Sequence, residues 1–386
     1  MDQITEAFWI ILAEGRIYLL FYALLALAML IELFYENPLV SRWLARAGAI
    51  AIALLIGLRW ETGTDWLSYF RIFYTNDTSA DYDMAVFGID HGYLLFNRLV
   101  YYFTSDYTIF LLLSAFIAVG LVYWFIEKST RYPCMGIYLF YTSYAMTHFM
   151  GSNRRMIAIG LVCVAFAYLR KERPLSKAWP KWTIPLAGAW AMHRTSLAAI
   201  PLMLIGKRAW PTQIVLIGLI ASLILGFMGL PFALLQWLGG VLSDYTGISA
   251  VNKLVFYTSD EVTLDANLDV GRQALFGVVK RGTVLAIFIT YMHLHRPSEY
   301  AQRLYNIFLV GCALYFLMIG APIFQVISTY FAIVEVVLLP IIFYEIRSLK
   351  VPYTIYLLIV PFFLLMSSLI PYMELYVPYA SVFDYY

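Results

Sequence analysis

Side chains that can do chemistry gather in the short segment 58–70, LRWETGTDWLSYF, between two long apolar runs. Arg59 ends the first run, Gly63 permits a sharp turn, and Asp65 follows that turn. Two interpretations stay open for this segment. In the first, Asp65 is a general base and Arg59 binds phosphate. In the second, the two residues form an ion pair, and Asp65 caps a helix expected over 65–74.

The stretch GSNRRMIA, residues 151–158, contains two adjacent arginines. We expect Arg154 and Arg155 to lie at a helix start, where free backbone N–H groups already favour anions. A guanidinium grips phosphate oxygens through two parallel hydrogen bonds, so this pair predicts a diphosphate site. The alternative is a topogenic signal or a contact with lipid headgroups.

A His-Arg pair, His193 and Arg194, falls inside the hydrophobic stretch AWAMHRTSLAAIP at 189–201. Charged groups at membrane depth are costly and therefore usually serve a function. We expect His193 to donate a hydrogen bond to a substrate oxygen rather than to bind metal. The alternative is a buried histidine whose hydrogen bonds a neighbouring helix satisfies.

A fourth cluster lies in DVGRQALFGVVKRG, residues 269–282. Arg272 is predicted at a helix start and is the candidate for binding phosphate, while Gln273 and Tyr69 are candidates for orienting sugar. Lys280 and Arg281 fall about two turns deeper, as 3.6 residues make one turn. Snorkelling toward the interface explains these two as well as function does.

Composition places these residues in a membrane. The chain has 386 residues, of which 62% are hydrophobic and 13% are charged, against about 25% charged in soluble domains. A net charge of +2 indicates no nucleic-acid partner. Zinc spacing, a P-loop and a Rossmann fingerprint are all absent from the sequence, so we expect no metal, nucleotide or other cofactor.

Long apolar runs predict an all-α, polytopic integral membrane protein with about 10–12 transmembrane helices. We expect one transmembrane domain over 1–386, with two polar extracytoplasmic loops at 59–106 and 231–272. The predicted spans are 16–35, 43–58, 107–127, 133–150, 155–170, 183–206, 212–230, 273–292, 304–320, 324–345 and 351–368.

Lys and Arg in the short loops set the orientation, because such loops stay cytoplasmic. The basic loops at 128–131, 170–181, 295–303 and 347–350 are therefore assigned to the cytoplasm. Only a broken or re-entrant hairpin at 183–206, interrupted near 193–196, returns Lys207 and Arg208 to that side. Irregular backbone at this depth needs a protein-lined or wet cavity, so His193 and Arg194 are expected to face an outward cavity.

In order along the chain, these motifs resemble the EpsG family. The resemblance rests on RWETGTDWLSYF, a Gly-Tyr element at Gly92-Tyr93, NRRMIA, HRTSLAAIP and STYFAIVEVVLLP (328–340), and it covers residues 40 to 345. The chain departs from the family pattern where His91 replaces a Glu, and where Gln325 and Val326 stand near an expected Arg.

The EpsG family groups with the Wzy-type O-antigen and exopolysaccharide polymerases, so the resemblance implies a GT-C-like membrane glycosyltransferase that needs no metal or nucleotide. The implied donor is a glycan on undecaprenyl pyrophosphate, and the acceptor is a lipid-linked repeat unit. A bacterial cytoplasmic (inner) membrane location with a periplasmic or extracellular site is implied, as are a flippase and a chain-length regulator as partners. Carried onto this chain, the matching positions are Arg59 and Asp65, Arg154 with Ala158, and His193 with Ser196.

Two other functions compete with this expectation. A flippase for lipid-linked oligosaccharide would use the same arginines, but it needs access from both faces, and cytoplasm-facing ionisable residues are scarce within the spans. A membrane O-acyltransferase needs a histidine reached by an acyl donor from the cytoplasm, whereas His193 is predicted on the outer side.

Overall fold

The computed structural model describes residues 2–75, 89–169, 175–243, 255, 270–319 and 321–385. Within these ranges the regular structure is helical, and the single β-type pairing is an isolated bridge between Arg59 and Ser381. The all-α prediction is therefore confirmed. Each apolar run predicted from the sequence is mainly helical over its described residues.

Six described helices are long and apolar enough to cross a membrane, or seven if a bent pair counts as one more. The remaining predicted runs are helical but do not meet that measure on their own. One reason is length, because α9 (Asn153–Tyr168) has only 16 residues. The six are Arg16–Tyr35, Pro38–Gly57, Tyr107–Ser129, Leu275–Leu294, Val326–Glu345 and Pro352–Tyr376, and the pair joins Thr212–Phe227 to Leu230–Ser243 at 62°.

The chain divides into two compact units. The first unit contains Met1–Asn76, His91–Met203 and Ile333–Tyr386, and the second contains Asp77–Asp90 and Leu204–Ala332. The single domain over 1–386 stays a prediction, as does the outer location of 59–106 and 231–272. Part of the latter segment is helical, since α12 covers Leu230–Ser243.

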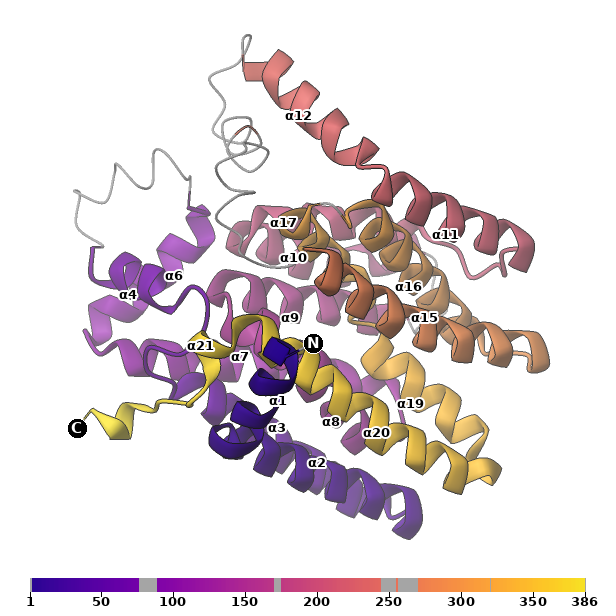
Figure 1. Ribbon diagram of the computed structural model, residues 1–386, viewed down its shortest axis with the longest axis horizontal. Coiled ribbons are helices and arrows are strands. Elements are labelled where there is room, and N and C mark those ends of the chain that lie inside the picture. The colour runs from indigo at the N-terminus through magenta and orange to yellow at the C-terminus, as the bar shows by residue number, and fades with distance from the viewer. Residues whose placement is uncertain are drawn as a thin grey trace. The chain divides into compact units, whose positions relative to one another are not determined.

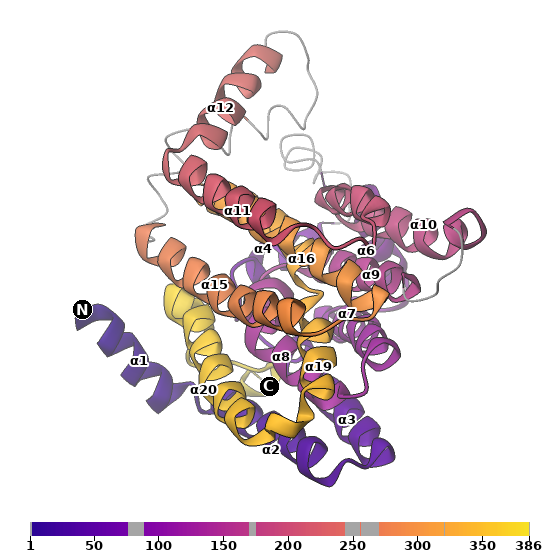
Figure 2. The ribbon, with the colours of Figure 1, turned by 90° about the vertical axis from the view of Figure 1, so that its right-hand side faces the viewer.

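The first unit is built around α8 (Pro133–Phe140), every residue of which is buried. Figure 2 shows α8 surrounded by neighbouring helices, and it contacts α2, α3, α7 and α19. The other helices of the unit are α1 (Asp2–Glu14), α2 (Arg16–Tyr35), α3 (Pro38–Gly57), α4 (Trp66–Tyr74), α6 (His91–Phe103), α7 (Tyr107–Ser129), α9, α10 (Leu175–Met192), α19 (Glu335–Glu345), α20 (Lys350–Leu369) and α21 (Met373–Tyr376).

The start of α8 explains why an acidic residue, Glu32, is buried within the predicted span 16–35. The buried carboxylate of Glu32 accepts hydrogen bonds from the backbone N–H groups of Cys134 and Met135, both at 2.9 Å. A helix start carries free N–H groups and partial positive charge, so a carboxylate there is stabilised. Glu32 therefore serves as the cap of α8.

After Phe140 the helix continues as η2 (Tyr141–Met150), ten residues of π-helix. Such wide segments are rare and frequently accompany functional sites. η2 ends immediately before Gly151 and Ser152, which lead into α9. The transition from π-helix to α-helix therefore lies directly before the arginine pair, Arg154 and Arg155.

The hairpin predicted at 183–206 is broken where the sequence predicts it. α10 ends at Met192, and the 3₁₀-helix η3 (Arg194–Leu204) begins two residues later. Two prolines inside α10, Pro180 and Pro185, each remove a backbone donor. The predicted break near 193–196 is confirmed.

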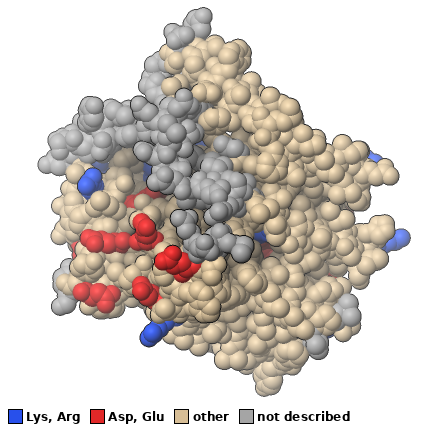
Figure 3. All heavy atoms as spheres, in the orientation of Figure 1, with Lys and Arg blue, Asp and Glu red and all other residues tan. Residues whose placement is uncertain are grey.

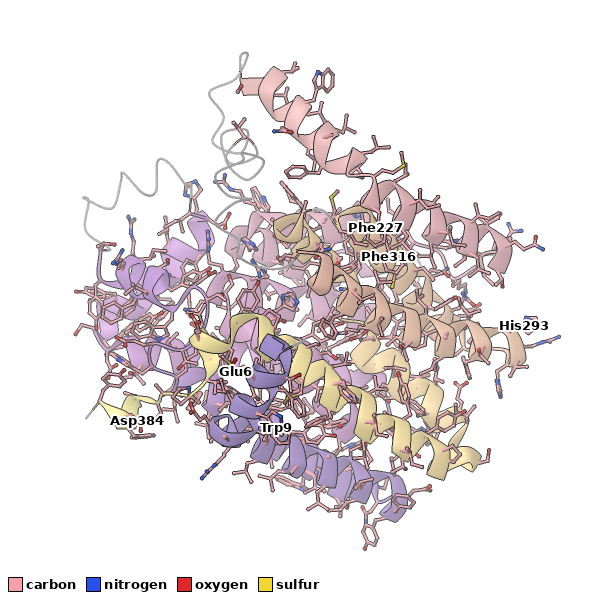
Figure 4. All side chains as sticks on the ribbon, in the orientation of Figure 1. Glu6, Trp9, Phe227, His293, Phe316 and Asp384 are labelled. Atoms are coloured by element: carbon pink, nitrogen blue, oxygen red, sulfur yellow. The ribbon has the colours of Figure 1, made fainter. Side chains whose placement is uncertain are left out.

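The second unit packs α11 (Thr212–Phe227) directly on α16 (Glu299–Leu317). A Cβ added to Gly226 would lie 1.9 Å from the Phe316 carbonyl oxygen, and Figure 4 shows Phe227 next to Phe316. Its other named elements are α12, α15 (Val270–Leu294), α17 (Pro322–Gln325), η4 (Val326–Ser328) and α18 (Thr329–Ala332).

Within this unit, the segment after η3 lies against the start of α16. Lys207 forms an ion pair with Glu299, and Arg303 donates a 2.8 Å hydrogen bond to the Ile205 carbonyl. The basic residues at 207–208 and those at 295–303 therefore share one end of the unit. The hairpin predicted at 183–206 requires these two basic segments to lie on the same side of the membrane.

Candidate functional site

The turn after α3 is shaped by Gly63. Its φ of +111° is disfavoured for other residues, and a Cβ there would lie 2.5 Å from the Met150 carbonyl oxygen. The neighbouring Thr64 hydroxyl donates a 3.2 Å hydrogen bond to the Gly151 carbonyl. The turn at 58–65 is therefore packed directly against the start of α9.

Arg59 is buried and bonded to the first residue of α9. The side chain is 1% exposed, and one terminal nitrogen donates a 2.8 Å hydrogen bond to Oδ1 of Asn153. Its other terminal nitrogen donates to the Ile56 carbonyl, and burial lowers the pKa of the guanidinium from its usual range. Arg59 thus holds the first residue of α9, and direct phosphate binding by Arg59 stays a prediction.

Asp65 has neither of the two structural roles that the sequence leaves open. It precedes α4, but its side chain forms no capping hydrogen bond. Among the described residues, no ion pair joins it to Arg59. Burial raises the pKa of this half-buried carboxylate, and the charge of Arg155, followed by that of Arg154, acts in the opposite direction.

Tyr69 positions Arg154. The buried Tyr69 hydroxyl lies 2.7 Å from the Ser152 hydroxyl and accepts a 3.2 Å hydrogen bond from Nε of Arg154. The guanidinium carbon also lies 5.7 Å from the centre of the Tyr69 ring, within cation–π range. On its other side Tyr69 meets the buried ring of Tyr93, at 5.6 Å between ring centres.

The start of α9 collects groups that attract anions. Ser152 provides no side-chain cap, and Arg154 and Arg155 lie half-buried in the first turn. The buried Nε of Arg155 has no hydrogen-bond partner among the described residues. A helix start with two guanidiniums beside a carboxylate can hold a diphosphate next to a proton acceptor.

His193 and Arg194 lie at the same end of α9 as the arginine pair. α10 packs along α9, with Gly188 opposite Leu161. Near the end of α10, a Cβ added to Gly92 would lie 2.7 Å from the Ala191 carbonyl oxygen, and the next residue, Tyr93, contacts the ring of Tyr69, which binds Arg154. His193 is half-buried and Arg194 is exposed, whereas Ser196 is buried with its Oγ unbonded within the described part of the chain.

The structure does not test whether Arg272 and Gln273 reach this site. Both belong to α15 in the second unit, and their side chains lie outside the described residues. Their roles stay predictions. The described residues also contain no group of three or more His, Cys, Asp or Glu arranged to hold a metal ion.

The site sits at a polar end of the first unit. Figure 3 shows acidic side chains gathered at the left-hand end, where Figure 1 places α4, α21 and the C-terminus. Two contributors were not predicted from the sequence: Asn153, which binds Arg59, and the C-terminal residues after α20. Asn153 directly precedes the arginine pair, so its place in that motif was a usable signal.

These features define a class, a polytopic all-α membrane protein whose candidate site contains arginines and a carboxylate at helix ends. A family model described as the EpsG family matches residues 42–381. The chain therefore belongs to the EpsG family, which points to a polysaccharide polymerase-type, glycosyltransferase-like function. No curated protein and no solved structure matches the chain.

Proposed function

We propose that this protein lengthens a bacterial polysaccharide by transferring the growing glycan from undecaprenyl pyrophosphate to a lipid-linked repeat unit. The transfer takes place at the periplasmic or extracellular face of the inner membrane. The observation that carries the proposal is the packing of the turn that contains Asp65 against the start of α9, where Thr64 donates a 3.2 Å hydrogen bond to the Gly151 carbonyl just before Arg154 and Arg155. The charges of Arg155 and Arg154 act on the Asp65 carboxylate, which makes no helix-capping hydrogen bond and, among the described residues, no ion pair with Arg59.

The reaction needs a proton acceptor and a grip on the leaving group. Asp65 takes the proton from the acceptor hydroxyl, and the freed oxygen attacks C1 of the donor sugar. The bond from C1 to the phosphate oxygen breaks, and undecaprenyl pyrophosphate leaves with the electron pair. Burial raises the pKa of Asp65 toward neutral pH, and a carboxylate with a higher pKa is a stronger base.

Arg154 and Arg155 stabilise the negative charge that grows on the diphosphate as this bond breaks. Donors fixed in advance stabilise such charge best, and one of them is typically worth about 10²–10³ in rate. Tyr69 fixes Arg154, and Arg59 fixes the start of α9 through Asn153. His193, at the same end of α10, is proposed to donate to a substrate oxygen.

Reconstitution in liposomes tests the enzyme against the flippase. The purified protein receives lipid-linked repeat units, and products are separated by size. A ladder of longer glycans, with release of undecaprenyl pyrophosphate, is the expected result. Movement of repeat units across the bilayer with no ladder would instead support transport.

A further inference from the structure

Partly exposed aromatic rings form a continuous surface beside the turn that carries Asp65. We name this surface the aromatic platform, and its members are Trp60, Phe70, Tyr74 and Tyr385. The ring centre of Trp60 lies 5.7 Å from that of Tyr385 and 6.0 Å from that of Phe70. Phe70 in turn lies 4.8 Å from Tyr74. Tyr74 is 42% and Tyr385 is 55% exposed, and all four residues lie outside the six described helices that could cross a membrane.

Buried rings hold the platform in place. Trp66, which directly follows Asp65, is buried and stacks on Phe70 with 5.0 Å between ring centres. Its ring also meets that of Trp60 edge-on at 4.9 Å. Tyr107, buried at the start of α7, meets Phe70 at 5.3 Å. Because rings fixed in advance lose little freedom on binding, such a surface suits a ligand that stacks on it.

The end of the chain returns to complete the platform. The backbone N–H of Trp60 donates a 2.9 Å hydrogen bond to the Ala380 carbonyl. One residue later, the N–H and the hydroxyl of Ser381 donate hydrogen bonds of 2.6 and 2.8 Å to the Asp384 carboxylate. Figure 4 shows Asp384 on this last segment of the chain. These bonds hold the neighbouring Tyr385 against Trp60.

Carboxylates border the Tyr385 end of the platform. The Tyr385 hydroxyl donates a 3.2 Å hydrogen bond to the exposed carboxylate of Glu61, and Asp384, also exposed, directly precedes Tyr385. Figure 3 shows acidic side chains gathered where the chain ends. A carboxylate accepts hydrogen bonds from hydroxyl groups and repels phosphates. This border therefore favours an uncharged, hydroxyl-rich ligand over lipid headgroups.

We propose that the aromatic platform binds the glycan of the substrate, with uncharged sugar rings stacked on its aromatic faces. This inference rests on the proposed function, which brings a glycan to the neighbouring Asp65. One face of a sugar ring carries C–H groups, which pack on the electron-rich face of an aromatic ring. Hydroxyl groups at the edge of the sugar can donate to the carboxylate of Glu61. The platform thus binds the sugars, while Arg154 and Arg155 bind the diphosphate.

The test removes the two most exposed rings of the platform, in Tyr74→Leu and Tyr385→Ala. Calorimetry in detergent measures how the purified full chain binds repeat-unit oligosaccharides freed of lipid, and how it binds farnesyl diphosphate. Losing one stacked ring should weaken oligosaccharide binding about 3–10-fold and leave farnesyl diphosphate binding unchanged. Tyr385→Phe keeps its ring and should bind the oligosaccharide nearly as the wild type does. Tyr102→Leu, which removes an 84% exposed ring on α6 outside the platform, should bind both ligands normally.

The possible failures can be told apart. If the wild type makes polymer but Tyr74→Leu and Tyr385→Ala bind the oligosaccharide as it does, the platform is wrong and the proposed function stands. If these variants lose oligosaccharide affinity but the wild type makes no polymer, the proposed function fails and the glycan-binding surface stands. Unchanged affinity with a lower yield of both variants in the membrane fraction would assign the rings to the membrane interface, where Tyr and Trp are common, and overturn the proposal. An equal loss of affinity in Tyr102→Leu would overturn it too.

Discussion

The guanidinium of Arg59 donates a 2.8 Å hydrogen bond to Oδ1 of Asn153, joining the turn after α3 to the first residue of α9. Both side chains are buried. This bond ties the segment that carries Asp65 to the segment that carries the arginine pair. The geometry of the proposed site therefore depends on a contact that no substrate needs to touch.

Removing this contact should destabilise the fold. Asn153→Ala leaves a buried guanidinium donor unsatisfied, which costs about 1–3 kcal/mol or more for a charged group. Thermal unfolding in detergent measures the loss. Asn153→Asp restores an acceptor at the same place and should lose less stability, while an unchanged melting temperature in Asn153→Ala would contradict this role.

Gly63→Ala should distort the turn. The added Cβ meets the Met150 carbonyl oxygen at 2.5 Å, and the φ of +111° is strained for alanine. Substitutions into an incompatible conformation cost more than about 1 kcal/mol, and we expect polymer synthesis to fall as well. Gly120→Ala on α7 is the control, because an added Cβ there meets nothing within 4 Å. Equal stability in the two variants would show that the turn can do without glycine.

The pH dependence of the reaction should report Asp65. The base works when ionised, so activity falls as the pH drops through the pKa of Asp65, which burial raises. The positive charge of Arg155 opposes that shift, so Arg155→Gln should move the acid limb of kcat/KM to higher pH. Arg98→Gln, an exposed arginine on α6, should leave the limb in place. If the acid limb of kcat/KM in Arg155→Gln moves to lower pH or stays in place, Asp65 is not the group whose ionisation sets that limb.

Local sequence patterns predict much of this fold. Continuous apolar runs give the helices because a membrane span needs about 20 such residues. The break at 193–196 follows from charge, since basic loops on both sides must share one face. The grouping of Asp65 with Arg154 and Arg155 follows from placing each motif at the end of a span.

The remaining parts of the site depend on contacts between distant residues. Thr62 and Ala380 are 318 residues apart in sequence yet share a hydrogen bond, and no short pattern encodes such a pair. The burial of Arg59 is missed for a related reason. An arginine at a span end reads as solvent- or substrate-facing unless its partner, here Asn153, is known in three dimensions.

The rate of undecaprenyl pyrophosphate release by Asp65→Asn, in nanodiscs supplied with lipid-linked repeat units, tests the central claim most directly. Asparagine keeps the shape of the side chain and removes its basicity. We predict a rate about 10²–10⁴ below the wild type, while Asp106→Asn, at a helix cap on α7, releases at the wild-type rate. Release by folded Asp65→Asn protein at the wild-type rate would contradict the account.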